Sequence, residues 1–213
     1  MRRTWQIIAI LCCVSLPAFG GLIAINNTGG AAPGSADPNW TINGGTAYVT
    51  DDTGGQFPFT AWMANDATSN WISPQASYAG LASDAPGTYN FATTFDLTGF
   101  LPSTAQITFR FAVDNAVTNV LINSLSTGIA APTPPDSGYT SFLGPYTISS
   151  GFQPGVNTLT FVVSNYTGAI GNPTGLRVEF LSATAEVPEP ATYALVGAGL
   201  VGLALLRRRR LTR

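Results

Sequence analysis

Apolar and polar side chains alternate along much of the chain between residues 25 and 185, and a period of two is typical of β-strands with one buried face. The clearest stretch is 106–113, where every second residue is apolar. No long stretch repeats with the period of an α-helix. The pattern predicts about eight short strands. The stronger ones cover 89–95, 106–113, 159–163 and 176–180, and the weaker ones cover 40–49, 117–122 and 146–148.

The segments between the predicted strands are rich in Gly, Pro, Asn and Asp, which favour tight turns. The chain of 213 residues contains 23 Gly and 15 Pro, and only 9% of it is charged, a composition that disfavours helical bundles. Many short strands joined by turns predict an all-β fold, an antiparallel β-sandwich or jelly roll. We assign this domain to residues 38–181. Residues 25–37 and 182–190 are predicted linkers, because they are rich in Gly, Ala and Pro.

The N-terminus has the parts of a secretory signal peptide. Two arginines precede an apolar run at 7–16, and small residues follow it. We place the signal peptide at residues 1–24, with cleavage by signal peptidase after Gly20 or Ala24. Both cysteines of the chain lie within it, so the mature protein is predicted to have neither a disulfide nor a thiol.

An uncharged, mostly apolar run occupies residues 191–206 near the C-terminus. As an α-helix it would be about 24 Å long, against about 30 Å for the hydrocarbon core of a bilayer, and we predict that it spans the membrane with the help of its flanks. The basic residues that follow predict a cytoplasmic tail at 207–213, with the rest of the chain outside. This basic cluster consists of Arg207, Arg208, Arg209 and Arg210.

Pro188, Glu189 and Pro190 stand just before the apolar run. The order of Pro-Glu-Pro, a short Gly- and Ala-rich helix and an arginine cluster resembles the PEP-CTERM sorting signal of exported bacterial proteins. The resemblance covers residues 187–213. It implies that an exosortase, a membrane transpeptidase, recognises the three residues and removes the tail. The protein would then pass from the inner membrane to the cell surface or the exopolysaccharide matrix.

Four turn motifs follow one another in the middle of the chain, namely Thr94–Gly99, Ala112–Asn115, Ile122–Asn123 and Gly155–Leu159. Their series is similar to that of galactose-binding-like jelly rolls, and the resemblance covers residues 88–181. It implies an antiparallel jelly roll with a turn at Asp114-Asn115. Ser124 stands where such modules usually have glycine, so a tight primed turn is not predicted there.

The charge and residue inventory excludes several classes of function. The chain has no lysine and no histidine, and only Arg110 and Arg177 are basic between residues 25 and 185, where nine side chains are acidic. Since phosphate binding depends on clustered Lys and Arg, no nucleic-acid partner is expected. Without histidine or a mature cysteine, the usual hydrolase triads, zinc sites and haem ligation are excluded. We assign no catalytic residue, and we predict that the protein is not an enzyme.

The acidic residues leave two further readings open. A glycosidase with paired carboxylates is allowed in principle, but Glu179 alternates with apolar strand residues and is expected to be a surface charge near Arg110 or Arg177. Calcium is the one metal that the inventory allows. None of its candidate sites has the spacing of an EF-hand loop, so we favour turn roles and assign no metal or cofactor. These candidates are Asp51-Asp52, Asn65-Asp66 and Asp114-Asn115.

Trp62, Trp71 and Tyr78 lie in a stretch rich in Asn, Ser and Thr. Aromatic rings stack on the apolar faces of sugars while amides and hydroxyls bond their hydroxyl groups, so these three residues are the candidate ligand-binding site. The alternative, which we favour for the two tryptophans, is that Trp62, beside Met63, and Trp71, beside Ile72, cap the hydrophobic core, because aromatic residues supply much of the buried area in small β domains.

Two hypotheses follow from these observations. The first is an exported protein of the cell surface or matrix whose β-sandwich binds or organises exopolysaccharide without catalysis. The second is a purely structural or adhesive surface module without glycan binding.

Overall fold

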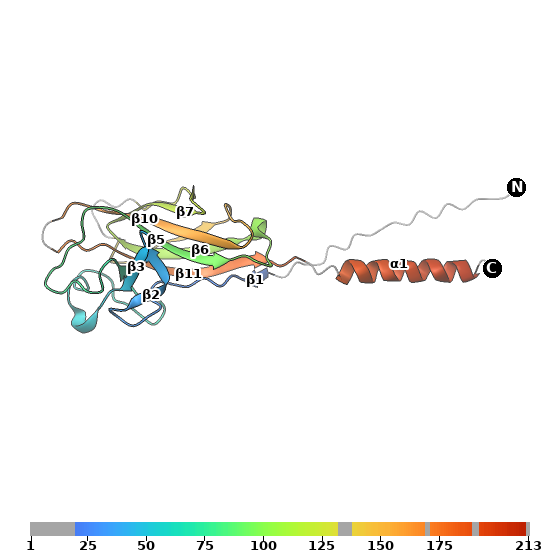
Figure 1. Cartoon of the computed structure of the whole chain (residues 1–213), viewed down its shortest axis with the longest axis horizontal. Helices are drawn as coiled ribbons and strands as arrows, with labels where there is room; N and C mark the ends of the chain where they lie inside the picture. The colour runs from blue at the N-terminus through green and yellow to red at the C-terminus, as the bar shows by residue number, and fades with distance from the viewer. Residues whose placement is uncertain (1–19, 132–137, 169–170, 189–191, 212–213) are drawn as a thin grey trace. The chain divides into compact units, whose positions relative to one another are not determined.

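The structure is a computed structural model of the chain, and it describes residues 20–131, 138–168, 171–188 and 192–211. The chain divides into two compact units. The first, Gly20–Pro188, is called the folded unit below and holds every strand among the described residues. The second contains helix α1 (Thr192–Leu211) (Figure 1).

The folded unit is built on one antiparallel sheet of 11 strands. These are β1 (Gly20–Leu22), β2 (Ala36–Ile42), β3 (Gly45–Val49), β4 (Ile72–Ser73), β5 (Gly87–Asp96), β6 (Gln106–Asp114), β7 (Ala116–Ile122), β8 (Leu125–Ser126), β9 (Leu143–Ile148), β10 (Val156–Asn165) and β11 (Gly175–Glu186). The strand order is β8-β7-β10-β5-β2-β3-β4-β11-β6-β9, and β1 pairs with β11 off this path. The prediction of an all-β, antiparallel domain is confirmed.

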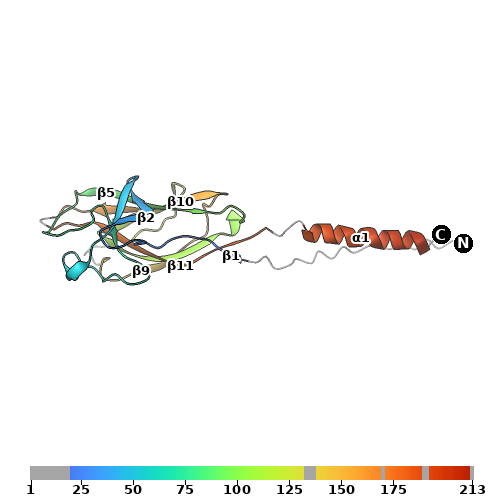
Figure 2. The same cartoon turned by 60° about the horizontal axis from the view of Figure 1, so that its bottom comes forward.

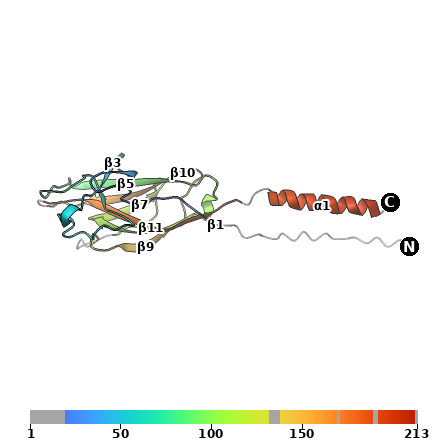
Figure 3. The same cartoon turned by 90° about the horizontal axis from the view of Figure 1, so that it is seen from below.

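The two ends of the strand order pack against each other. The rings of Phe109 and Phe111 on β6 lie 5.4 and 5.6 Å from the ring of Phe161 on β10, although β6 and β10 are not neighbours in the sheet. Side views show β5 and β10 on one side of the unit and β9 and β11 on the other (Figures 2 and 3). The apolar residues of the alternating stretches fill the core between them, because each strand buries one face.

The predicted strand at 40–49 is a hairpin instead. Asn43 and Gly44 adopt positive φ angles of 52° and 75°, and they turn the chain between β2 and β3. Asn-Gly is the sequence that a two-residue primed turn favours, because both of its central residues need positive φ. The alternation on either side of the turn is therefore that of two short strands.

A second primed turn joins β7 to β8 at Asn123-Ser124, where no tight turn was predicted. Both residues have positive φ, 51° and 68°, and the flanking residues Ile122 and Leu125 pair. The Asn123 amide donates to the Gly151 carbonyl at 2.9 Å and to Oδ1 of Asn157 at 2.7 Å. These bonds anchor Asn123, the first central residue of the turn, and Ser124 takes the left-handed conformation at the second position without glycine.

The N-terminal arm, residues 20–37, lies along β11 and forms part of the fold. Gly20 and Leu22 pair with Glu186 and Thr184. Further along, the Thr28 N–H donates to the Val178 carbonyl at 3.2 Å. The structure therefore differs from the predicted boundaries, which gave this stretch to the signal peptide 1–24 and the linker 25–37.

Glycine explains why the arm resembles a linker in sequence. A Cβ on Gly21 would stand 2.7 Å from Cε1 of Phe100, and one on Gly29, whose φ is +86°, would stand 2.3 Å from Cβ of Asn70. Glycine is used here for close approach rather than for flexibility. The other predicted linker, 182–190, also differs, because β11 continues to Glu186.

We expect signal peptidase to cleave after Gly20 rather than after Ala24. Cleavage after Ala24 would remove all of β1 and also Ile23. The Ile23 side chain is only 5% exposed in the core, and its N–H donates to the Ala183 carbonyl at 2.9 Å. N-terminal sequencing of the mature protein from its own host should give Gly21 as the first residue. A mature chain that begins at Ile25 would contradict this expectation.

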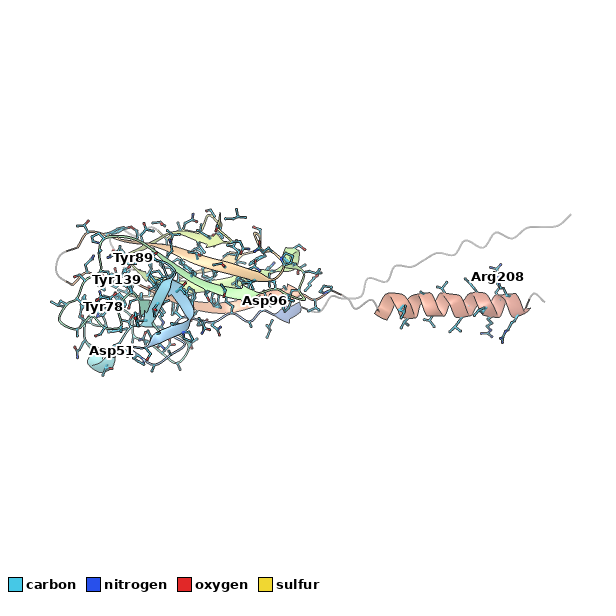
Figure 4. All side chains as sticks on the ribbon, in the orientation of Figure 1. Asp51, Tyr78, Tyr89, Asp96, Tyr139 and Arg208 are labelled. Carbon is cyan, nitrogen blue, oxygen red and sulfur yellow. The ribbon has the colours of Figure 1, made fainter. Side chains whose placement is uncertain are left out.

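Helix α1 covers the predicted helical run at 191–206 apart from its first residue and continues through the arginine cluster to Leu211. Figure 4 shows Arg208 projecting from this helix. Among the residues that the structure describes, no helix is long and apolar enough to cross a membrane. The structure therefore does not show the transmembrane helix predicted at 191–206.

Candidate functional site

Trp62, Trp71 and Tyr78, the predicted ligand-binding residues, lie together but inside the folded unit. The two indole rings stack with centroids 4.3 Å apart, and the Tyr78 ring meets Trp62 edge-on at 6.3 Å. Their side chains are 4%, 0% and 0% exposed, respectively. Rings buried to this extent offer no face to a sugar, so the structure places them in the alternative role, as core.

The polar atoms of this aromatic cluster are all bonded within the protein. The Trp62 indole donates to Oδ2 of Asp114 at 2.7 Å, and the Trp71 indole donates to the Met63 carbonyl at 2.9 Å. The Tyr78 hydroxyl donates to Asp84, and burial together with this carboxylate raises the pKa of Tyr78. The cluster is thus satisfied without a ligand.

Small residues on β6 and β11 let the cluster form on the outer face of the sheet. Ala112 packs in the cluster, and Gly175 lies so close that a Cβ there would meet the Trp62 ring at 2.4 Å and the Trp71 ring at 3.2 Å. The loop between β3 and β5 therefore closes over this face as a second hydrophobic core, separate from the one between the sheet layers.

The same outer face carries an ion network around Arg177, whose side chain is fully buried. Its Nη2 lies 2.6 Å from Oδ2 of Asp66 and 3.6 Å from Oε1 of Glu179, and its Nε donates to Oγ of Ser69 at 2.7 Å. Arg110 completes the network, with Nη2 2.6 Å from Oε2 of Glu179. Both basic residues of the folded unit are therefore held in ion pairs.

Glu179 pairs with Arg110 as predicted, but it is 3% exposed rather than a surface charge. The strand alternation places Glu179 on the outer face of β11, and Phe142 and the loop before β4 cover that face. The Arg110 and Arg177 guanidinium groups lie 4.3 and 5.0 Å from the centroid of the Phe142 ring. A glutamate tied into this network is poorly placed to act as a general acid or base.

The acids named as calcium candidates serve local structure. Oδ1 of Asp51 accepts from the N–H and hydroxyl of Thr53, and these bonds lower the pKa of Asp51. Burial raises the pKa of Asp66, but bonds from the Thr68 and Ser69 N–H groups and from Arg177 outweigh it and hold this pKa below its ordinary value. Across the described ranges, no group of three or more acidic, His or Cys side chains could hold a metal ion.

A polar hollow of about 610 Å³ lies where the N-terminal arm meets β2, β11 and the loop before β4. It is named the asparagine pocket here, after Asn26, Asn27 and Asn39 on its wall; Thr68 and Phe180 also line it. This site was not predicted from the sequence, because the arm has the composition of a linker. Its one local signal was the Asn26-Asn27 pair within a Gly-rich stretch.

The tail has its own sequence signature. Residues 186–210 match the family model of the PEP-CTERM protein-sorting motif. The chain carries a PEP-CTERM sorting motif. It is therefore an exported protein that an exosortase sorts to the cell surface. No curated protein matches the chain, so the motif identifies the route of the protein but not the task of its folded unit.

The PEP-CTERM motif begins at Glu186, the last residue of β11, and reaches through most of α1. Pro188 is the second residue after the strand, whereas Glu189 and Pro190 lie outside the described residues. The cluster Arg207–Arg210 is exposed in the last turns of α1. The recognised segment thus starts directly where the folded unit ends.

Proposed function

We propose that the folded unit works at the cell surface or in the extracellular matrix as a non-catalytic module that binds or organises exopolysaccharide. The PEP-CTERM motif carries this proposal, because it delivers the chain to the compartment where exopolysaccharide is found. In this proposal the antiparallel sheet of the folded unit serves as the scaffold, in the manner of a jelly-roll binding module.

The surface chemistry supports an uncharged, polar partner. Arg110 and Arg177 are held in ion pairs, so the folded unit has no cluster of cations for a polyanion. Hydroxyl and amide groups line the outward face of the β2, β5 and β10 layer instead, where they can bond sugar hydroxyls. On this face lie Thr41, Asn90, Thr94, Thr158 and Thr160.

The residue inventory supports a role without catalysis. The folded unit contains neither histidine nor cysteine. Of its buried carboxyl groups, Glu179 and Asp84 are tied to arginine and tyrosine partners, and Asp37 accepts from the N–H groups of Gly29 and Asn39. A general acid needs a proton that it can deliver to a substrate, and none of these carboxyl groups faces the asparagine pocket.

Affinity measurement on the host's own exopolysaccharide tests the proposal. Mature protein purified from the host should be retained on a column of that polysaccharide and should elute with the free polymer. The same protein, heat-unfolded, serves as the control. If the native protein passes through unretained, the folded unit is instead a structural or adhesive module.

A further inference from the structure

We propose that the asparagine pocket is a binding site for an uncharged saccharide, an inference that rests on the proposed function and gives it a location. The pocket combines three properties. It has hydrogen-bonding groups that are not used by the protein's own bonds, a rim fixed by hydrogen bonds, and a partly apolar, uncharged lining.

Two side-chain amides present unused polar atoms side by side. Nδ2 of Asn26 donates to Oδ1 of Asn39 at 3.2 Å. Within the described part of the chain, Oδ1 of Asn26 and Nδ2 of Asn39 have no bonded partner, so the joined pair offers one acceptor and one donor. A sugar hydroxyl can donate to the first and accept from the second, which is the pairing that amides and hydroxyls allow. The Thr68 hydroxyl on the same wall adds a further group.

Hydrogen bonds within the protein already fix the rim of the pocket, so that it does not need a ligand to become ordered. Oδ1 of Asn27 accepts from the Phe180 N–H at 2.8 Å, and its Nδ2 donates to the Thr68 carbonyl at 3.1 Å, so this residue ties the arm to two other segments. Opposite it, Asp37 is 6% exposed and accepts from the N–H groups of Gly29, at 2.7 Å, and Asn39, at 2.8 Å. A preformed rim lowers the ordering cost of binding.

Ile25 and Phe180 supply the apolar part of the wall. The Phe180 ring is held by stacking on Trp40 with centroids 6.4 Å apart and an interplanar angle of 18°. Sites for small ligands commonly combine such apolar surface with a few fixed polar groups. None of the described residues that line the pocket is charged, so its partner is an uncharged sugar rather than an acidic one. Binding should therefore change little with salt.

The test compares the affinity of mature protein variants for depolymerised host exopolysaccharide and for neutral hexoses by titration calorimetry. In the double variant Asn26→Ala, Asn39→Ala, the loss of both amides should weaken binding about tenfold or more. Gln106→Ala is the control, since Gln106 is an exposed side-chain amide on β6 outside the pocket, and the affinity of this variant should be unchanged. Unfolding midpoints of all variants show whether folding is intact.

A second variant keeps the test decisive if the double variant folds poorly. Ala67 is an exposed lining residue, so Ala67→Trp should fill the hollow and abolish binding while the fold is kept. If wild type binds and both variants bind equally well, glycan binding stands but the pocket is not its site. A second outcome is that the host polymer does not bind but a neutral hexose does, and that Ala67→Trp abolishes hexose binding. The pocket is then a saccharide site, but the proposed role in the matrix is wrong. Failure of every sugar to bind wild type overturns the pocket.

Discussion

Replacement of Arg177 by methionine is expected to lower the free energy of unfolding of the mature protein by about 3–5 kcal/mol. The substitution keeps an apolar side chain of moderate length but removes the cation that faces Asp66 and Glu179, at 2.6 and 3.6 Å. It also removes the donors to Ser69 and the Ala64 carbonyl. A buried carboxylate that loses a partner keeps its desolvation cost, which is why breaking such a pair is severe. Urea unfolding followed by fluorescence measures the loss.

Arg110→Met is the matched control for Arg177→Met. Arg110 shares the partner Glu179 and the Phe142 ring, but its side chain is 43% exposed, whereas that of Arg177 is 0% exposed. An exposed ion pair contributes about 1 kcal/mol or less, so Arg110→Met should cost much less than Arg177→Met. Equal losses in the two variants would show that burial does not set the strength of this network.

The longer strands could be predicted because the alternation of apolar and polar residues that marks a strand lies within the strand's own sequence. Alternation at 106–113 identifies β6 and its inner face, and the aromatic core between β6 and β10 follows from that face. Strands that contribute only two or three residues, such as β4, carry no pattern long enough to detect. Whether 40–49 is one strand or two depends on the Asn43-Gly44 turn, and that signal was present in the sequence but not used.

The exposure of the outer face could not be predicted in the same way. Alternation places Glu179 on that face, but whether a loop covers the face depends on contacts between distant segments. Trp62 bonds to Asp114, which is 52 residues away, and Ser69 bonds to Glu179, which is 110 residues away. Glu179, which looked like a surface charge in sequence, is therefore buried beneath the loop together with Trp62 and Trp71.

The asparagine pocket lay beyond sequence reasoning for a related reason. Its walls come from the N-terminal arm, β2, the loop before β4 and β11, and only the tertiary fold brings Asn26, Thr68 and Phe180 together. The arm has the Gly-rich composition of a linker, yet its glycines make close contacts with Phe100 and Asn70. A Gly-rich composition shows only that side chains are absent. It does not distinguish a flexible segment from a segment that packs tightly.

Trp71→Ala is the second substitution with a large expected effect, a loss of about 3–5 kcal/mol in the free energy of unfolding. The Trp71 ring is fully buried, stacks on Trp62 at 4.3 Å and donates to the Met63 carbonyl. Its removal leaves a large cavity in the second core and an acceptor without its partner, and neither the sheet nor the loop can collapse to fill the space. Thermal and urea unfolding of the mature protein measure the change.

Tyr166→Ala is the control for Trp71→Ala, because Tyr166 is 41% exposed and its truncation should change stability by only about 0.5 kcal/mol or less. The comparison also decides between the two roles considered for the tryptophans. A Trp71→Ala protein that keeps wild-type stability but loses retention on exopolysaccharide would return the sugar site to the aromatic cluster. If the variant is destabilised but its folded fraction still binds exopolysaccharide, Trp71 belongs to the core. Recognition is then left to the asparagine pocket, which agrees with the burial of Trp71.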